Sequence, residues 1–173
     1  DLPASRRCLI GISGGRDSVA LLHALHQQGY TKLIVCHINH RLRGRASGQD
    51  AAFVQRLATR LGYACEVATV DVTTFARTSR QSIETAAREA RHAFFAAMAR
   101  KHRCPRVLLA HHADDQVETV LQHFVKGTGI RGLRGMKVKR DLIVRPLLFA
   151  FRDEIETYCT EQNLNYRTDS SNA

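Results

Sequence analysis

A glycine-rich turn at residues 13–18, Ser-Gly-Gly-Arg-Asp-Ser, carries residue types suited to binding phosphate. Gly14 and Gly15 let the backbone turn tightly and approach an anion closely. Free amides there, and at the start of the helix that follows, would face that anion. Asp17 would repel a bare phosphate, so its presence predicts that Mg²⁺ accompanies the phosphates.

The turn differs from two common nucleotide-binding patterns. A Walker A loop needs Gly-Lys followed by Ser or Thr, and a dinucleotide site needs G-x-G-x-x-G; the turn has neither. The alternative interpretation is a structural turn in which Asp17 or Ser18 caps the helix. Six suitable residues at one strand-to-helix junction favour phosphate binding.

A second polar set, His111-His112-Ala113-Asp114-Asp115, leads into another predicted helix. Asp115 and Glu118 are three residues apart, so their side chains project from the same helical face. Such a pair beside a nucleotide could hold Mg²⁺ or the ammonium group of an amino acid. The alternative is that these acids stabilise the helix N-terminus through its dipole. The histidines form no H-E-x-x-H pattern, which argues against zinc.

Two further groups are less specific. Glu84, Arg88 and Arg91 are spaced by four and three residues, so they share one face of a long predicted helix. For Glu84 with Arg88, a surface ion pair worth a few tenths of a kcal/mol is the simpler interpretation. Residues 37–43, His-Ile-Asn-His-Arg-Leu-Arg, follow a predicted strand, and such a turn is by itself usually structural.

The chain is basic, with 26 Lys and Arg against 16 Asp and Glu and a net charge of +10. Between residues 126 and 145 seven basic residues accompany a single acid, Asp141: Lys126, Arg131, Arg134, Lys137, Lys139, Arg140 and Arg145. This excess of positive charge favours binding of a polyanion such as nucleic acid. The glycine-rich loop at 127–135 is suited to contact with a phosphate backbone. A solvated basic surface and a flexible crossover loop are the alternatives.

The elements that position these residues follow from the hydrophobic pattern. Strands are expected at residues 7–13, 32–39, 64–72, 106–112 and 142–148. Helices are expected at residues 17–28, 47–61, 82–101, 114–126 and 152–163, with a loop at 128–140. The alternation predicts an α/β fold with a five-stranded parallel sheet. Ligands in such sheets bind at the carboxyl ends of the strands, where the strand order reverses, and most of the polar motifs fall at such ends.

Details of these helices follow from single residues. Ser82 is expected to cap the helix at 82–101, and Gly29 and Gly62 are expected to end the first two helices. In the helix at 114–126 the apolar positions expected to face inward are Val117, Val120, Leu121 and Phe124.

The composition sets the broad class. A chain of 173 residues with 44% hydrophobic residues can bury a core as one domain. The five cysteines are odd in number and form no C-x-x-C pair, which argues against a disulfide framework and favours reduced thiols in the cytoplasm. No apolar run approaches the ~20 residues of a membrane span, so no membrane partner is expected.

The turn at 13–18 resembles the PP-loop of the N-type ATP pyrophosphatases. Further blocks, in the same order along the chain, resemble the tRNA(Ile)-lysidine synthetase family within that group. They are HINHRLR at 37–43, IETAAREAR at 83–91, AHHADDQVET at 110–119, KGTGIRGLRGM at 126–136, RPLL at 145–148 and DSSN at 169–172. Together these blocks cover nearly the whole chain.

The resemblance implies a Rossmann-like three-layer α/β sandwich of the PP-loop ATPase type. It implies that residues 1–173 form the catalytic domain, without the family's C-terminal tRNA-binding domains. ATP with Mg²⁺ is then expected to adenylate the wobble cytidine of tRNA(Ile) with a CAU anticodon. Free lysine attacks the activated base, and AMP leaves. The product, lysidine, pairs with A instead of G and changes codon specificity from AUG to AUA. A homodimer is left open.

The resemblance also assigns the site residues. The expected ATP contacts are Ser13, Gly14, Gly15, Arg16, Asp17, Ser18, His37 and His111. The expected catalytic residues are Asp17, which also binds the metal, Arg91, Asp115 and Glu118. The expected substrate contacts are Asp115 and Glu118 for lysine, with Arg88, Arg131 and Arg134.

Two alternatives remain at this stage. The first is another PP-loop enzyme, such as a tRNA thiolase. Thiolases usually need catalytic cysteines, and the scattered ones here argue against that activity, although Cys36 and Cys104 lie in or near strands that could form a site. The second is a basic RNA-binding module that holds ATP without turnover.

Overall fold

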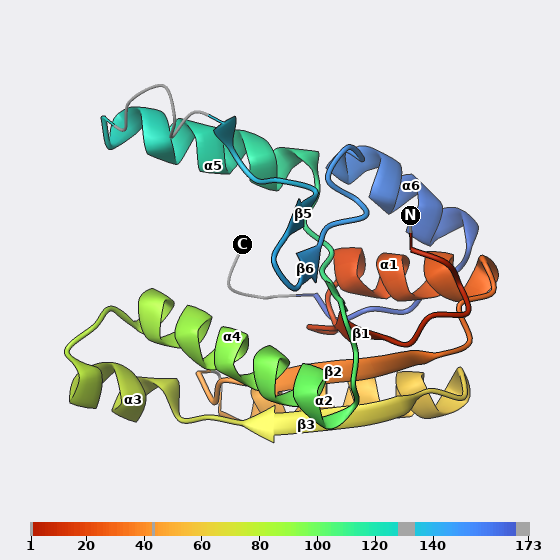
Figure 1. The fold of residues 1–173 in the computed structure, drawn as a ribbon, viewed down its shortest axis with the longest axis horizontal. Helices are drawn as coiled ribbons and strands as arrows, with labels where there is room; N and C mark the ends of the chain where they lie inside the picture. The colour runs from red at the N-terminus through yellow and green to blue at the C-terminus, as the bar shows by residue number, and fades with distance from the viewer. Residues whose placement is uncertain (1, 43, 128–133, 169–173) are drawn as a thin grey trace.

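Six strands form one sheet in the computed structural model, which describes residues 2–42, 44–127 and 134–168 (Figure 1). The strands are β1 (Cys8–Gly11), β2 (Leu33–Asn39), β3 (Ala64–Thr69), β4 (Val107–Leu108), β5 (Lys139–Arg140) and β6 (Ile143–Val144). The helices are α1 (Arg16–Gln27), α2 (Arg45–Arg60), α3 (Val72–Ser79), α4 (Ile83–Lys101), α5 (Ala113–Val125) and α6 (Arg152–Glu161). Strands and helices alternate through most of the chain, as the pattern predicts.

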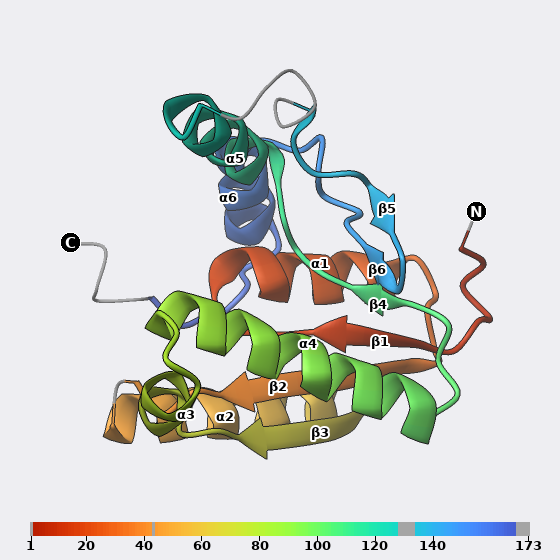
Figure 2. The same ribbon diagram turned by 60° about the vertical axis from the view of Figure 1, so that its left-hand side comes forward.

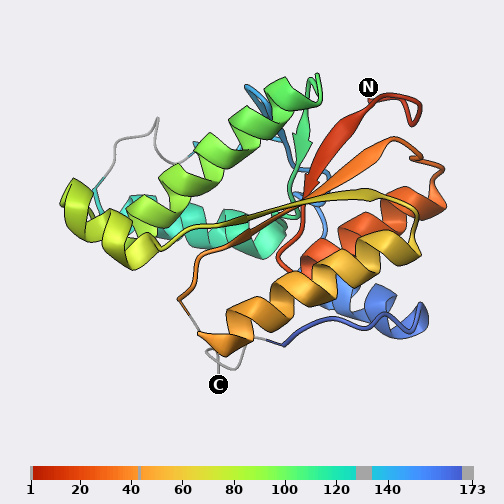
Figure 3. The same cartoon turned by 90° about the horizontal axis from the view of Figure 1, so that it is seen from below.

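The sheet lies between two helical layers, as Figure 3 shows. Successive side chains of a strand point to opposite faces. Ile10 of β1 therefore packs with α1 and α2, whereas Leu9 packs with Phe95 of α4. Each fully buried aliphatic side chain of this kind contributes about 1.5–3 kcal/mol. The predicted three-layer α/β sandwich is confirmed.

The strand order, β3-β2-β1-β4-β6-β5, reverses direction beside β1 (Figure 2). From β1 the chain crosses to β2 and β3 by way of α1 and α2. It then returns through α4, on the opposite face, to β4 on the other side of β1. The carboxyl ends of β1 and β4 therefore diverge at the switch point, which is the usual ligand position in such sheets.

Helix boundaries follow the local signals in the sequence. The hydroxyl of Ser82 accepts a 3.1 Å hydrogen bond from the amide of Thr85 and caps α4, as predicted. Gly29 and Gly62, just beyond α1 and α2, have φ angles of 79° and 77°. L-residues rarely adopt such angles, which explains why glycine ends these helices.

The prediction of five parallel strands needs correction, because the sheet has six strands and one of them is antiparallel. β5 pairs antiparallel with β6 and lies inside the segment predicted to be a loop. The expected strands at 106–112 and 142–148 shorten to two residues each. The strand expected at 64–72 ends at Thr69, and α3 follows it, capped by Asp71, whose side chain accepts from the amide of Thr74.

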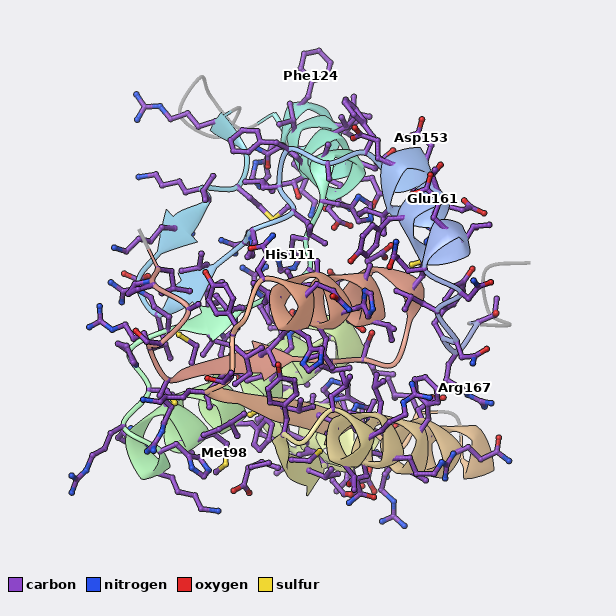
Figure 4. All side chains as sticks on the ribbon, turned by 90° about the vertical axis from the view of Figure 1, so that its right-hand side faces the viewer. Met98, His111, Phe124, Asp153, Glu161 and Arg167 are labelled. Atoms are coloured by element: carbon purple, nitrogen blue, oxygen red, sulfur yellow. The ribbon has the colours of Figure 1, made fainter. Side chains whose placement is uncertain are left out.

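Helix α5 extends away from the sheet (Figure 1). Val117, Val120, Leu121 and Phe124 were expected to face inward, yet Val117, Leu121 and Phe124 are 53%, 56% and 70% exposed, and only Val120 is partly buried. Phe124 points outward at the end of the helix in Figure 4. The prediction of an inward stripe is wrong because α5 lies beyond the sheet, where no described element covers that face. None of the helices in the described ranges has both the length and the apolar character needed to cross a membrane.

Candidate functional site

A cavity of about 590 Å³ opens at the carboxyl ends of β1, β2 and β4. Its walls are formed by Gly11, Ile12, Ser13, Asp17, Ser18, Cys36, His37, Ile38, Asn39, His40, Leu42, Ser47, Asp50, Arg91, Phe95, Leu109, Ala110 and His111. A Cβ atom at Gly11 would lie 2.6 Å from Leu109 Cδ2 and 2.8 Å from Phe95 Cζ, so a larger residue there would force these side chains to shift. The cavity combines residues that are far apart in the sequence, at the place where the strand order reverses.

The turn at 13–18 forms one wall and is held by its own serines. The Ser18 hydroxyl accepts a 3.3 Å hydrogen bond from the Gly14 amide and donates a 2.9 Å bond to the Gly15 carbonyl. The Gly15 amide donates to the Ser13 hydroxyl at 3.2 Å. Both glycine amides are thus occupied, so the prediction that they are free to bind an anion is wrong. The backbone amides that have no hydrogen-bond acceptor within the helix are those of the first turn of α1.

The segment after α6 packs against this turn. The Arg167 amide donates a 2.9 Å hydrogen bond to the Gly14 carbonyl. The Arg167 guanidinium donates from Nε to Asp50 Oδ1 at 3.0 Å and from Nη2 to Gln49 Oε1 at 3.0 Å. The Asp50 side chain is only 8% exposed and belongs to α2. The sequence carried no signal for this contact, which joins the turn, α2 and the C-terminal segment.

A buried histidine links the two predicted acidic motifs. The Nε2 atom of His112 lies 3.7 Å from Asp17 Oδ2 and 3.7 Å from Asp115 Oδ2, and its side chain is 3% exposed. The other acid oxygen nearby, Asp114 Oδ2, lies 3.4 Å from His112 Nδ1. Carboxylates from α1 and α5 therefore converge on one imidazole. The sequence predicted that one of the two histidines of the 111–115 motif is hydrogen-bonded near the nucleotide, and only His111 was assigned to the site.

Asp115 and Asp114 also cap helices, so the structural interpretation of these acids holds in part. Asp115 Oδ2 accepts a 2.9 Å hydrogen bond from the His112 amide at the start of α5. Asp114 Oδ2 accepts a 2.9 Å bond from the Arg152 amide at the start of α6, and this bond is the main reason why the pKa of Asp114 is lowered.

The residues present fit a magnesium ion that arrives with a nucleotide. Asp17 lines the cavity with a side chain that is 33% exposed, and its Oδ1 lies 3.3 Å from Arg16 Nε. One carboxylate together with substrate phosphates is a usual ligand set for Mg²⁺. Among the described residues, no cluster of three or more His, Cys, Asp or Glu side chains could hold a metal alone.

Two cavity residues are suited to nucleotide contact. Arg91 faces the cavity, and no carboxylate of the described residues forms an ion pair with it. Although Arg91 is exposed, partial desolvation of its guanidinium, followed by the nearby Arg88, lowers its pKa. The His37 ring is buried, its Nδ1 lies 2.8 Å from the Ile12 carbonyl, and its Nε2 has no partner within the described part of the chain. Because the carbonyl can only accept, Nδ1 carries the hydrogen and Nε2 is a free acceptor.

Several predicted site residues lie outside the cavity lining. Arg16 pairs with Glu156 of α6 at 2.9 Å. Glu118 has a side chain that is 63% exposed and lies 3.9 Å from Arg152. Arg88 on α4 and Arg134 are exposed on the surface. Arg131 lies outside the described residues.

The one cysteine of the cavity lining is not suited to nucleophilic chemistry. Cys36 is 1% exposed, and burial raises its pKa to about 12. A thiol needs to ionise to act as a nucleophile, so Cys36 is inert near neutral pH. Cys104, the other cysteine of interest, lines a separate shallow depression beside the end of α4.

Curated relatives are similar to this chain over nearly all of its length. It is 48% identical over 168 residues to a protein named tRNA(Ile)-lysidine synthase from Porphyromonas gingivalis, covering 96% of this chain and 37% of the relative. It is 43% identical over 171 residues to a protein of the same name from Bacillus subtilis, covering 95% and 36%. The chain thus spans little more than a third of the length of these relatives.

Solved structures share the fold. The U34-tRNA thiolase NcsA from Methanococcus maripaludis superposes with a TM-score of 0.76 at 19% identity, covering 96% of this chain and 59% of the thiolase. An NH3-dependent NAD synthetase from Campylobacter jejuni gives 0.63 at 17% identity, covering 93% and 66%. A family model described as the PP-loop domain matches residues 2–173. Together with the glycine-rich turn at the end of β1, this match shows that the chain belongs to the PP-loop domain family.

Proposed function

We propose that this chain is the catalytic part of an enzyme that uses ATP to join lysine to the wobble cytidine of tRNA(Ile), forming lysidine. The observation that carries the proposal is the approach of Asp17 and Asp115 to the same nitrogen of His112. It brings the predicted phosphate-binding turn close to Asp115, one of the two predicted amine-binding acids, beside the cavity that Asp17 lines. The relatives named tRNA(Ile)-lysidine synthase support the choice of reaction.

The first step is adenylation of the base. The carbonyl oxygen at position 2 of the cytidine attacks the α-phosphorus of ATP, and the bond to the β-phosphate oxygen breaks, releasing pyrophosphate. Arg91 and the first-turn amides of α1 stabilise the charge on the phosphates. When bound on Asp17, Mg²⁺ neutralises part of that charge.

The second step is attack by lysine. The ε-amino group loses a proton and adds to carbon 2 of the activated base, and AMP leaves with the former carbonyl oxygen. Asp115 and Glu118 hold the amine, and one of them accepts its proton. Adenylation is needed because AMP is a far better leaving group than the unmodified oxygen.

The RNA reaches the cavity through basic surface. Arg134, Lys137, Lys139 and Arg140 are exposed on the segment that ends with β5, whose Met136 is hydrogen-bonded to Gln116 near the start of α5. Lysine and arginine side chains bind the phosphate backbone, while the anticodon base is unstacked to enter the site. The proposal includes a CAU anticodon, a cytoplasmic location, and residues 1–173 acting as one catalytic domain.

Product analysis tests the function directly. tRNA(Ile) is incubated with the protein, ATP, Mg²⁺ and isotope-labelled lysine, and its nucleosides are analysed by mass spectrometry. We expect labelled lysidine, with one AMP and one pyrophosphate per modified base. Incorporation of sulfur from a persulfide donor in place of lysine would support the thiolase alternative. ATP binding without any covalent product would support a non-catalytic RNA-binding module.

A further inference from the structure

An arginine outside the cavity holds one of the cavity histidines. Arg145 follows β6, and its Nε donates a 3.1 Å hydrogen bond to Nδ1 of His111. A guanidinium can only donate, so Nδ1 must carry the lone pair. A neutral His111 therefore carries its hydrogen on Nε2. Among the described residues no other hydrogen bond is formed by this ring, which lines the cavity.

The guanidinium of Arg145 is itself fixed by the backbone. Its Nη1 donates to the Lys137 carbonyl at 2.9 Å, and its own amide donates to the Val138 carbonyl at 2.8 Å. Arg145 does not line the cavity. Its effect on a ligand must therefore pass through His111, which Figure 4 shows near the middle of the molecule.

Burial and the nearby charges keep the His111 ring neutral. Burial is the main cause, and the cations Arg145 and Arg91 act in the same direction as His112, while Asp115 opposes them. Together they lower the pKa of His111 to about 4. The ring therefore stays in one neutral form throughout the range in which enzymes usually work.

We propose that Arg145 is a positioning residue that locks His111 in the tautomer protonated at Nε2, and that this N–H donates to a phosphate oxygen of the nucleotide. The inference rests on the proposed nucleotide site. A donor whose tautomer is set before the ligand arrives needs no reorganisation when charge develops on the phosphates. A neutral donor also avoids repelling the lysine ammonium, which a third cation beside Arg91 and Arg145 would do.

The tautomer can be read without any activity. Long-range ¹H–¹⁵N correlation spectra of the protein report which ring nitrogen carries hydrogen, and the His111→Gln variant identifies the His111 signals. We expect Nδ1 to be the unprotonated nitrogen from pH 8 down to about pH 5. An unprotonated Nε2, or protonation of both nitrogens near pH 6.5, overturns the inference.

The donor role is tested by variants at both positions, using titration calorimetry with a non-hydrolysable ATP analogue and Mg²⁺. His111→Phe, which keeps a ring but no donor, should weaken binding at least tenfold, and His111→Gln, whose amide can donate, should recover most of it. Arg145→Met should also weaken binding, and its loss should shrink below pH 6.5, because His111 becomes easier to protonate and a protonated ring carries hydrogen on Nε2 in any case. Arg60→Met, an exposed arginine at the end of α2, serves as the control.

The double variant separates positioning from a general structural effect. If Arg145 acts through His111, Arg145→Met adds little to the loss already caused by His111→Phe, and the binding loses its dependence on pH below 6.5. Additive losses, or full binding by His111→Phe, overturn the inference. Binding results of the expected kind without any lysidine formation would instead contradict the proposed reaction and leave the histidine assignment intact.

Discussion

The backbone amide of Arg167 lies 2.9 Å from the carbonyl oxygen of Gly14, so the C-terminal segment is bonded directly to the phosphate-binding turn. The same residue reaches Asp50 on α2 through its guanidinium at 3.0 Å. Residues separated by some 150 positions thus share one structural unit at the mouth of the cavity. The first prediction concerns this unit.

Arg167→Ala should loosen the turn. The pair with Asp50 is partly exposed on the arginine side, so we expect a loss of about 1 kcal/mol in the free energy of unfolding. ATP affinity should fall by about tenfold, because the guanidinium no longer ties this segment to Asp50 and Gln49, and the segment whose backbone amide bonds Gly14 is then held less firmly. Urea denaturation and ATP titration measure the two effects. Arg56→Ala, an exposed arginine of α2, should change neither, and an Arg167→Ala protein with wild-type ATP affinity would contradict the role.

Asp17→Ala should abolish AMP and pyrophosphate release in an assay with tRNA, ATP and lysine. The Asp17 carboxylate is the proposed Mg²⁺ ligand in the cavity. We therefore expect the rate of AMP and pyrophosphate release to fall by about 100-fold or more. Asp153→Ala, a substitution of an exposed acid on α6, is the matched control. Activity within several-fold of wild type would reject the metal role of Asp17.

Glu118→Ala should raise the lysine concentration needed for half-maximal rate while ATP binding stays unchanged. Glu118 lies outside the cavity lining and close to Arg152, so its contact with lysine requires an approach from the solvent side of α5. Rates measured over a lysine series give the result, with Glu161→Ala as the control. Unchanged lysine dependence would place amine recognition on Asp115 alone.

Cys36 should not react with alkylating reagents in the folded protein. Its pKa of about 12 leaves on the order of one thiolate in 10,000 at pH 8. Mass spectrometry of alkylated peptides, before and after unfolding, tests this. Cys36→Ala should keep pyrophosphate release within several-fold of wild type. Rapid labelling of Cys36 together with inactivation would revive the thiolase alternative.

Stability should fall as the pH drops below 6.5. Burial first, and then Arg145, lower the pKa of His111 in the folded protein from 6.5 to about 4. The unfolded chain then binds the proton at a higher pH than the folded chain, so acid favours unfolding. Between pH 7 and pH 5 we expect His111 to account for a loss on the order of 1–2 kcal/mol. Urea denaturation at several pH values should show a smaller loss in His111→Gln.

The sequence by itself predicted the α/β class, every described helix except the short α3, and the turn at 13–18. These features depend on local spacing: apolar residues at helical intervals, the cap at Ser82, and glycines whose positive φ ends α1 and α2. The predictions were wrong where the local sequence pattern does not determine the position of an element in the fold. The apolar stripe of α5 resembles a buried face, yet nothing in the stripe tells whether the helix will lie on the sheet or beyond it.

Only the tertiary structure decided which polar residues meet. The contacts of His112 with Asp17, of Arg145 with His111 and of Arg167 with Gly14 all join segments that are distant along the chain. Such contacts depend on the strand order, because β4 lies beside β1 only after the chain has crossed to the opposite face of the sheet. Side-chain type and spacing determine what chemistry a residue can do, but the packing of the sheet and its helices determines its partner.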